Sequence, residues 1–392
     1  MHELHHANCL DILRTMPDAS VDAVVTDPPY GLSFMGKRWD YDVPGVEIWE
    51  QCLRVLKPGG YLLAFAGTRT QHRMAVRIED AGFEIRDMIA WMYGSGFPKS
   101  HNVSKGFDRE AGILKPEFKG FTVAGSSHNP NISKTIPTKG YVPPAPVTDE
   151  AKQWQGWGTA LKPAMEPITM ARKPFKGTVA DNVQAYGTGA INIDGCRIGN
   201  DLIKTIAKSQ GEGFQTDYNG CEESTHIGRW PANVLHDGCE DVLRGMGEAA
   251  RFFYTAKACK EDRDDGCEML EARGRTFAFQ RCSICGKQKV NVPGSACQCV
   301  DPEWVDAVEH SPRQNFHPTV KPTDLMRYLC RMVTPPGGIV LDPFTGSGST
   351  GRGAVLEGFR FIGCEMDADY IEIAKARILA AEKAYQPCLT FD

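Results

Sequence analysis

The stretch Asp27-Pro28-Pro29-Tyr30 combines residue types that suit a planar ring carrying an amino group. Asp27 can accept hydrogen bonds from that amino group, and Pro28 has a carbonyl that accepts but no N–H that donates. Tyr30 offers a flat face for stacking. The two prolines make the loop stiff, because each of them fixes φ. An ordinary proline-rich turn is the alternative explanation, since short motifs also occur by chance.

The tetrapeptide follows residues 21–25, a short apolar run rich in β-branched side chains. Such a run is typical of a buried parallel strand. In open α/β sheets, ligands bind outside the carboxyl ends of the strands. We therefore predict that Asp27, Pro28, Pro29 and Tyr30 lie at the ligand-binding edge of a sheet.

A second motif, Asp342-Pro343-Phe344-Thr345-Gly346-Ser347-Gly348-Ser349, follows another apolar run. Its glycines let a ligand approach the backbone at the start of a predicted helix. Asp342 can accept from an ammonium group, and Phe344 can pack on adenine. Glu365 ends the next predicted strand, where a carboxylate suits the hydroxyls of a ribose.

Two ligands fit this second motif. Gly346, Gly348 and Gly351 match the dinucleotide fingerprint, and Glu365 lies about 20 residues beyond, where a ribose-binding acid belongs. An NAD-type ligand therefore competes with S-adenosylmethionine. The position of the motif near the C-terminus, with no substrate domain after it, and the acid Asp342 favour S-adenosylmethionine.

A third pattern consists of cysteines, of which the chain has 14. The pair Cys282 and Cys285 is followed by the pair Cys297 and Cys299. Four thiolates at these spacings can close a tetrahedral zinc site, which would be structural because no coordination position stays open. Four free buried thiols are the alternative, and in a reducing compartment we do not expect a disulfide framework.

Composition sets the limits of the interpretation. A chain of 392 residues that is 42% hydrophobic can bury a full core and suggests two or three domains. The net charge of −5 argues against a polycationic surface, but residues 99–176 carry 12 Lys or Arg against 6 Asp or Glu. That stretch is either a solvated loop face or a surface that contacts phosphates. No apolar run reaches the length of a membrane span and no signal-peptide region is present, so we expect a soluble, cytoplasmic protein.

The periodicity divides the chain into five parts. Strands are expected at 21–25, 61–66, 83–93, 164–172, 339–341 and 360–364, and helices at 9–16, 47–56, 69–81, 319–333, after residue 350 to about 357, and from 367 onwards. Trp154 and Trp157, in a glycine-rich segment, are expected to be buried anchors, with wedge or stacking residues as the alternative. We predict a catalytic half at 1–93, a basic Gly/Pro-rich insertion at 94–160, a returning strand at 161–176, a target-recognition region with the zinc site at 177–315, and a cofactor-binding half at 316–392.

With these motifs in this order, the chain resembles DNA amino-methyltransferases of the permuted class, in which the catalytic motif precedes the cofactor motif. The resemblance rests on residues 27–30, on Asn315-Phe316-His317-Pro318-Thr319-Val320-Lys321-Pro322, on residues 342–349 and on Glu365. These motifs and their strands cover a little under half of the chain. The middle of the chain carries no part of the resemblance.

The resemblance implies an α/β fold with a seven-stranded, mostly parallel, Rossmann-like sheet and a large inserted target-recognition region. It implies S-adenosylmethionine as methyl donor and Asp27, Pro28, Pro29 and Tyr30 as catalytic residues. The cofactor-binding residues that it implies are Asp27, His317, Thr319, Lys321, Asp342, Phe344, Gly346, Gly348, Ser349 and Glu365.

The expected reaction is methylation of the N6 amino group of an adenine flipped out of double-stranded DNA. Asp27 favours adenine, because in the resembling family this tetrapeptide goes more often with adenine and a leading Ser with cytosine. Methylation of cytosine N4, of RNA or of protein glutamine, and a non-catalytic zinc-containing DNA-binding protein, are the alternatives. The expected partner is DNA and not a membrane, while a cognate restriction enzyme, a homodimer and the recognition sequence stay open.

Overall fold

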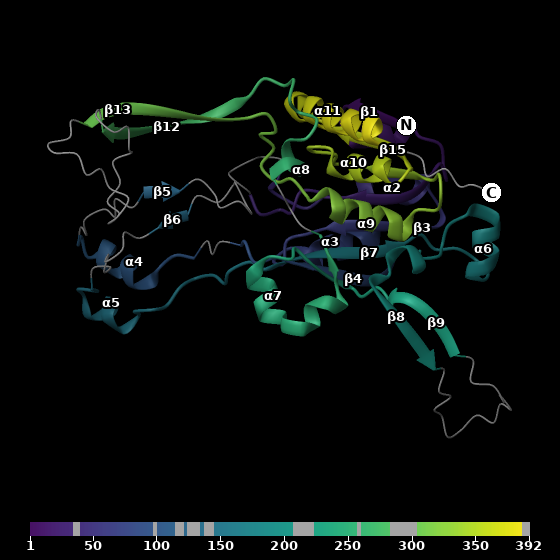
Figure 1. Cartoon of the computed structure of the whole chain (residues 1–392), viewed down its shortest axis with the longest axis horizontal. Helices are drawn as coiled ribbons and strands as arrows, with labels where there is room; N and C mark the ends of the chain where they lie inside the picture. The colour runs from purple at the N-terminus through teal and green to yellow at the C-terminus, as the bar shows by residue number, and fades with distance from the viewer. Residues whose placement is uncertain are drawn as a thin grey trace. The chain divides into compact units, whose positions relative to one another are not determined.

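The computed structural model describes residues 1–33, 40–96, 100–113, 121–123, 134–136, 145–206, 223–256, 260–282 and 304–385 (Figure 1). The chain forms two compact units. The first comprises residues 1–94, 165–258 and 319–392, and the second comprises residues 95–164 and 259–318. The expected target-recognition region, 177–315, is thus divided between the two units.

The first unit is built on one large sheet. Its order is β1 (His2–His6), β15 (Arg360–Glu365), β14 (Ile339–Asp342), β2 (Val21–Thr26), β3 (Leu56–Phe65), β7 (Met165–Arg172), β4 (Glu84–Met92), β10 (Val234–His236) and β11 (Tyr254–Thr255).

Neighbouring strands are parallel except where β7 lies between β3 and β4, with which it pairs antiparallel. The expected pairing of the returning strand with the strand that ends near Tyr93 is confirmed. The predicted α/β fold and mostly parallel sheet are confirmed as well.

The sheet has nine strands among the described residues, rather than the seven expected. The additional strands, β10 and β11, extend the edge beyond β4 and span three and two residues. Strands this short leave almost no periodic signal in the sequence. The edge strand β1 was not predicted either, because His2-Glu3-Leu4-His5-His6 contains one apolar residue.

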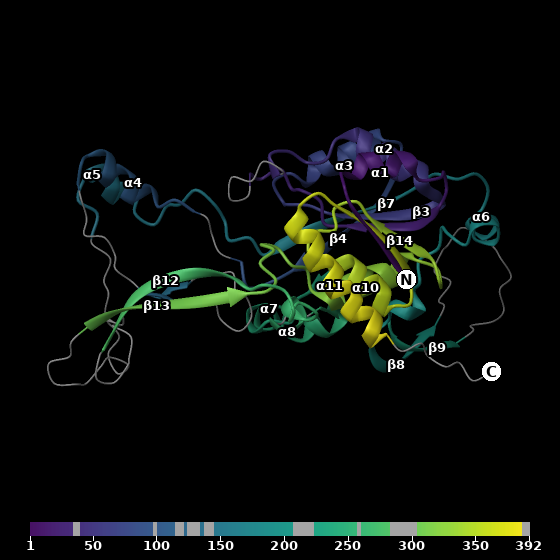
Figure 2. The same cartoon turned by 90° about the horizontal axis from the view of Figure 1, so that it is seen from above.

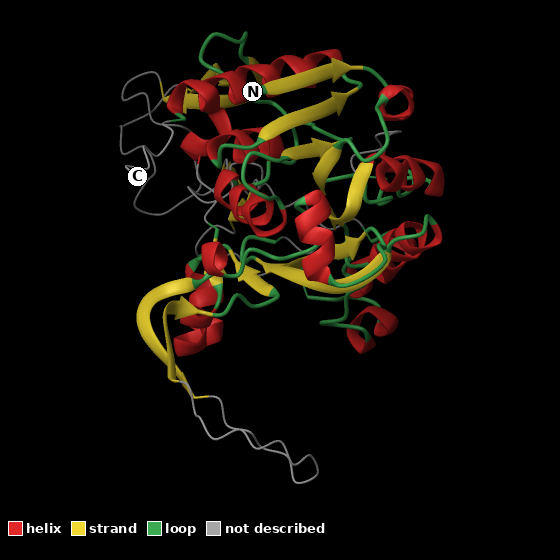
Figure 3. Cartoon of the chain, turned by 90° about the vertical axis from the view of Figure 1, so that its right-hand side faces the viewer, coloured by secondary structure: helices red, strands yellow, loops and turns green. Residues whose placement is uncertain are grey.

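Helices cover both faces of the sheet (Figures 2 and 3). One face packs against α1 (Cys9–Thr15), α2 (Val46–Val55) and α3 (Gln71–Asp80). The other packs against α9 (Thr323–Val333), α10 (Ser349–Leu356) and α11 (Ala368–Ala384). The predicted helices therefore form, with ends shifted by a few residues. Further helices are α6 (Val179–Tyr186) and α7 (Glu240–Met246), with short 3-10 turns at Asp194–Cys196 and Gly247–Phe252.

The central strands are buried on both faces, which explains their continuous apolar sequences. In β3, Tyr61, Leu63 and Phe65 belong to the cluster on the α9 side, whereas Leu62 and Ala64 belong to the cluster on the α2 side. This alternation is the two-residue period of an extended strand. The central strands are therefore held from both sides.

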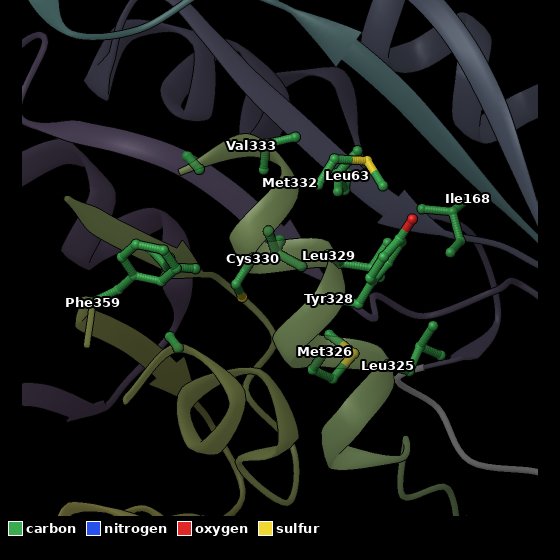
Figure 4. Packing of buried hydrophobic residues seen from close by; sticks show 14 of the residues in the cluster. Leu63, Ile168, Leu325, Met326, Tyr328, Leu329, Cys330, Met332, Val333 and Phe359 are labelled. Atoms are coloured by element: carbon green, nitrogen blue, oxygen red, sulfur yellow. The ribbon is translucent and has the colours of Figure 1, made fainter. Parts of the chain in front are cut away.

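Helix α9 fills the centre of one face with large side chains (Figure 4). Leu325, Met326, Leu329 and Cys330 are fully buried against the sheet, in one cluster with Leu63 and Ile168. The helix starts at Thr323, later than predicted, because Pro322 occupies its N-cap position with a non-helical ψ of 134°. Residues 319–322 therefore form a connection that leads into the helix.

A hairpin of β8 (Ile198–Ile206) and β9 (Glu223–Arg229) also belongs to the first unit (Figure 1). The second unit contains α4 (Val103–Glu110), α5 (Asp149–Gln153) and α8 (Lys260–Asp264). It also contains two antiparallel pairs, β5 (Phe121–Val123) with β6 (Lys134–Ile136) and β12 (Arg273–Cys282) with β13 (Trp304–Arg313).

The expectation that Trp154 and Trp157 are buried anchors is wrong. Their rings meet edge to face at 5.0 Å, but Trp154 is 36% exposed and Trp157 is 60% exposed. The helix beside them, α5, spans five residues and offers too little surface to cover two indoles. In the part of the chain that the structure describes, no helix is both long and apolar enough to cross a membrane.

Candidate active site

The two motifs meet at one edge of the sheet, because β2 and β14 are adjacent and parallel. Val340 pairs with Ala23 and Leu341 with Val24, so both strands end at the same level. The Thr26 hydroxyl donates to Asp342 Oδ1 at 2.6 Å, and both side chains are buried. The loops that carry the two motifs are therefore joined directly by a side-chain hydrogen bond.

Four polar side chains form a cluster around the first motif. The Tyr30 hydroxyl lies 2.7 Å from Asp27 Oδ1 and 3.1 Å from Glu166 Oε2. Lys321 Nζ donates to Asp27 Oδ2 at 2.7 Å and lies 3.2 Å from Glu166 Oε2. Lys321 also lies 4.9 Å from the centre of the Phe65 ring. We call Asp27, Tyr30, Glu166 and Lys321 the carboxylate cluster.

Burial and charge act together on this cluster. Burial opposes the charged form of Lys321, but the Asp27 and Glu166 carboxylates outweigh it and raise the pKa of the ammonium. Burial, followed by the same two carboxylates, raises the pKa of the Tyr30 phenol well above its usual value. Lys321 is therefore charged and Tyr30 neutral at physiological pH, so the hydroxyl acts as a donor.

The loop that carries Tyr30 is fixed by a residue that sequence reasoning missed. Asp40 is buried, and its Oδ1 accepts from the N–H groups of Tyr30 at 2.6 Å and Gly31 at 3.0 Å. Its Oδ2 accepts from Leu32 N–H at 3.2 Å. The Thr70 hydroxyl donates to the Tyr30 carbonyl at 2.6 Å. Tyr30 is thus held at its backbone as well as at its hydroxyl.

The second motif relies on one carboxylate to shape its glycine loop. Glu365 Oε2 accepts from Gly346 N–H at 2.8 Å, and Oε1 accepts from Asp367 N–H at 2.8 Å. Gly346 has a φ of +53°, in the left-handed region that favours glycine. Burial raises the pKa of Glu365. The predicted ribose acid therefore also orients the loop.

The other glycines of the loop are explained by packing inside the protein. A Cβ on Gly348 would lie 2.8 Å from the Cα of Ala374 in α11, and φ at Gly348 is +78°. A Cβ on Gly351 would lie 2.4 Å from Ile378 and 2.6 Å from the Phe361 ring. These two glycines let α10 pack closely against α11 and β15, which is also the role of the third fingerprint glycine in dinucleotide folds.

The fully buried Arg377 supports the same loop from α11. Its guanidinium donates to the Ser347 carbonyl at 2.8 Å and to the Ser349 hydroxyl at 3.1 Å. Neither the sequence motif nor the helical pattern identified this arginine. Ser349, predicted to bind cofactor, is buried and accepts this bond.

Asp342 lies beneath the loop and is buried. Oδ1 accepts from Thr26 and, at 3.0 Å, from Phe344 N–H, and the side chain also bonds to Thr350. Burial raises the pKa of Asp342 to about 6, although these hydrogen bonds oppose the shift. The Phe344 ring is tilted against Trp49, with ring centres 6.3 Å apart. Direct contact of Asp342 with a methionine ammonium stays a prediction.

The remaining predicted cofactor residues precede α9. Thr319 is exposed and belongs to the first unit, as does Lys321. His317 belongs to the second unit, where it is buried and its carbonyl accepts from Arg263 at 2.6 Å. The contact of His317 with a cofactor stays a prediction.

The predicted zinc site falls on residues of which the structure says little. Cys285, Cys297 and Cys299 lie outside the described residues, and Cys282 is the last residue of β12. Elsewhere in the described chain, no group of three or more His, Cys, Asp or Glu side chains could hold a metal ion. The zinc site stays a prediction.

Comparison with protein families gives one result that covers most of the chain. Residues 21–376 match the N6/N4 methyltransferase family, whose description is DNA methylase. This span exceeds half of the chain and includes both motifs. The chain therefore belongs to the N6/N4 DNA methylase family.

Two characterised relatives are similar over shorter stretches. The Type II methyltransferase M.HindIII of Haemophilus influenzae (strain ATCC 51907 / DSM 11121 / KW20 / Rd) is 26% identical over 194 residues, which are 48% of this chain and 51% of that protein. The DNA adenine methyltransferase YhdJ of Escherichia coli (strain K12) is 44% identical over 62 residues, 16% of this chain and 21% of that protein. The chain thus matches about half of the first relative and a fifth of the second.

Among solved structures, the complex of M1.HpyAVI with SAM aligns with 96% of this chain and 99% of that one. The sequence identity is 16% and the TM-score is 0.41. The sheet order and strand directions given above rest on this chain's own hydrogen-bonded pairs.

Proposed function

We propose that this protein transfers a methyl group from S-adenosylmethionine to the exocyclic amino group of a base in double-stranded DNA. The observation that carries the proposal is the junction of the two motifs at one sheet edge. Asp27 follows β2, the glycine loop follows the neighbouring parallel strand β14, and Thr26 bonds to Asp342 between them. Membership of the DNA methylase family supports the same reading.

The residues of the second motif fit the proposed cofactor. Glu365 holds the Gly346 N–H, and its carboxylate would accept from the two hydroxyls of a ribose. The partly buried Phe344 can cover one side of an adenine ring. When bound, S-adenosylmethionine supplies a methyl group on a positively charged sulfur. We propose Asp342, Phe344, Gly346, Gly348, Ser349 and Glu365 as its binding residues, with His317, Thr319, Lys321 and Asp27 contributing from the neighbouring segments.

The first motif would bind and activate the amino group. Each Asp27 oxygen takes one hydrogen bond from the cluster, from Tyr30 or from Lys321, so each keeps acceptor capacity for an amino hydrogen. The Pro28 carbonyl would accept the other amino hydrogen. Two acceptors would draw the nitrogen toward tetrahedral geometry and expose its lone pair. The contribution of the protein is then orientation and electrostatics.

The target base must leave the duplex to reach this edge. Lys321 Nζ lies 3.1 Å from the Tyr30 hydroxyl and 5.4 Å from the centre of the ring, so the ammonium holds the hydroxyl end of the ring. We propose that a flipped base stacks on a face of the Tyr30 ring. Anchoring at the Tyr30 hydroxyl and backbone would keep the ring in place for stacking.

Adenine is the proposed base, with cytosine N4 as the alternative. Support comes from the leading Asp27 of the motif and from the likeness to YhdJ, which is a DNA adenine methyltransferase. A transfer assay with labelled S-adenosylmethionine on DNA, RNA and protein tests the substrate class. We expect label in DNA alone, and label in RNA or protein alone would contradict the proposal. Binding of NAD without binding of S-adenosylmethionine, measured by calorimetry, would instead support the dinucleotide alternative.

We also retain the structural zinc proposal on Cys282, Cys285, Cys297 and Cys299. Elemental analysis of purified protein should find one zinc per chain, and Cys285→Ser should lose it while the cofactor still binds. Zinc absent from the wild-type protein would remove this proposal. The methylation proposal is independent of that result.

A further inference from the structure

Glu166 is the member of the carboxylate cluster that neither sequence motif contains. It comes from β7, which runs against its neighbours in the sheet. The first residues of an antiparallel strand lie at the edge where its parallel neighbours end, and Glu166 pairs with Trp91 near the end of β4. The inserted strand therefore brings a carboxylate to the edge that carries Asp27.

The contacts of Glu166 link it to every other member of the cluster. Its Oε2 lies 3.1 Å from the Tyr30 hydroxyl and 3.2 Å from Lys321 Nζ, and Lys321 reaches Asp27 Oδ2 at 2.7 Å. The Lys321 side chain is 8% exposed, against 20% for Asp27 and 21% for Glu166. Buried charges interact more strongly than exposed ones, because water screens them less.

Two carboxylates, one ammonium and one neutral phenol give the cluster a net charge of −1. The charges of Asp27 and Lys321 alone would cancel. Glu166 therefore supplies the excess negative charge, and it gives the Lys321 ammonium a second carboxylate to bond. Without it, Asp27 would be the one carboxylate bonded to Lys321, beside the Tyr30 hydroxyl at 3.1 Å, and the remaining acceptor capacity of Asp27 would weaken.

We propose that Glu166 is a positioning residue for methyl transfer, which keeps Lys321 shared between two carboxylates and makes the cluster negative. This inference rests on the proposed function. In the transfer, the amino lone pair forms a bond to the methyl carbon, and the carbon–sulfur bond breaks with its electron pair on sulfur. One positive charge thus moves from sulfur to the amino nitrogen, which then gives a proton to Asp27 and, through it, to water. A net negative cluster stabilises the charge that appears on nitrogen.

The variant Glu166→Gln removes the charge while it nearly keeps the shape. We expect kcat for DNA methylation to fall about 30-fold, a change in activation free energy of about 2 kcal/mol. The KM for DNA and the Kd for S-adenosylmethionine should stay within about twofold of wild type, because Glu166 acts in the transition state. Glu166→Asp, which keeps the charge, should recover at least about fivefold over Glu166→Gln.

A matched control comes from the other end of the β4–β7 strand pair. Glu84 on β4 bonds to Arg172, the last residue of β7, at 2.7 Å. Glu84→Gln makes the same chemical change in the same strand pair, away from the cluster, and should leave kcat unchanged. Thermal unfolding of all three variants should show that each is folded at the assay temperature.

The outcomes separate the inference from the function on which it rests. Wild-type activity with an equally active Glu166→Gln overturns the positioning role and leaves the proposed function intact. Equal losses in Glu166→Gln and Glu166→Asp, with weakened cofactor binding, also overturn it, because they indicate a structural role. A wild-type protein that transfers no methyl group to DNA overturns the proposed function, and the inference falls with it.

Discussion

Two Asp-Pro turns, at Asp27 and at Asp342, lie at the ends of neighbouring parallel strands, and their aspartates have opposite environments. Asp27 directly follows β2, is partly exposed and pairs with the ammonium of Lys321. Asp342 ends β14, is buried and accepts from Thr26 and from the Phe344 backbone. The same dipeptide at the same sheet edge thus provides a partly exposed carboxylate and a buried one that braces a loop.

The difference arises from what surrounds each turn. Around Asp27 the fold gathers charged and phenolic side chains from distant parts of the chain, namely Glu166 and Lys321 with Tyr30. Around Asp342 it gathers hydroxyl and backbone donors, and burial dominates. Substitution of Asp27 should therefore affect methyl transfer, whereas substitution of Asp342 should affect stability.

The largest effect is expected for Asp27→Ala. It removes the proposed acceptor of the amino hydrogens and leaves the glycine loop alone, so methyl transfer should be lost. Binding of DNA and of S-adenosylmethionine should survive within about tenfold, or about 1.4 kcal/mol. Steady-state transfer assays and calorimetry measure the two quantities. If Asp27→Ala lost cofactor binding together with methyl transfer, the proposed difference between the Asp27 turn and the Asp342 turn would be contradicted.

Asp342→Asn should change stability, and the change should depend on pH. The pKa of Asp342 is raised from 3.8 to about 6 in the folded protein, so the folded state holds the proton more tightly than the unfolded state. The free energy of unfolding of the wild-type protein therefore falls as the pH rises between these two values. Above pH 6 the total loss is about 3 kcal/mol. The Asn variant lacks this loss, so its stability relative to wild type should increase from pH 4 to pH 7.

Chemical denaturation at several pH values measures this difference. The neutral amide keeps an oxygen for Thr26 and Phe344, which makes Asn a fair replacement for the protonated acid. A stability difference that does not change with pH would show that burial of Asp342 is not coupled to its ionisation.

Tyr30→Ala should reduce transfer by about 1–3 kcal/mol, the typical worth of one base stacked on an aromatic ring. Tyr30→Phe keeps the ring and removes only the hydroxyl that contacts Asp27 and Glu166, so its effect should be smaller, about 1 kcal/mol. Transfer rates on DNA compare the two variants. A larger loss for Phe than for Ala would exclude stacking as the main role of the ring.

Asp40→Ala should have a smaller effect on transfer and a clear effect on stability. The substitution leaves the N–H groups of Tyr30, Gly31 and Leu32 without their acceptor, which should lower the free energy of unfolding by about 2 kcal/mol. Transfer should fall about tenfold because the Tyr30 loop loosens, with cofactor binding unchanged. Denaturation and transfer assays test the two parts, and unchanged transfer would show that the loop is held by other contacts.

The sequence predicted the parts of this site that are local in the chain. Residues 27–30 and 342–349 follow apolar strands, so their place at the carboxyl edge follows from the α/β pattern alone. The pairing of β7 with β4 was also predictable, because the strand returns soon after an irregular segment.

The parts that depend on tertiary contacts were not predictable. Glu166 looked like one residue of a returning strand, and its role depends on β7 being antiparallel. Asp40 lies in a loop of polar and glycine residues without a periodic pattern. In the sequence, Arg377 looks like an ordinary charged residue on an alanine-rich helix. Glu166 and Arg377 act on residues far away in the sequence, and Asp40 acts across its own irregular loop, and a single sequence does not encode such contacts in its spacing.

The most direct test of the account is mass spectrometry of nucleosides from DNA treated with S-adenosylmethionine and either wild-type protein or Asp27→Ala. We predict N6-methyladenine with the wild-type protein and none with the variant. N4-methylcytosine alone would replace the proposed base and keep the amino-methyltransferase assignment. Unmodified DNA with the folded, cofactor-binding wild-type protein, or equal modification by the variant, would contradict the central claim that Asp27 acts at this sheet edge in methyl transfer.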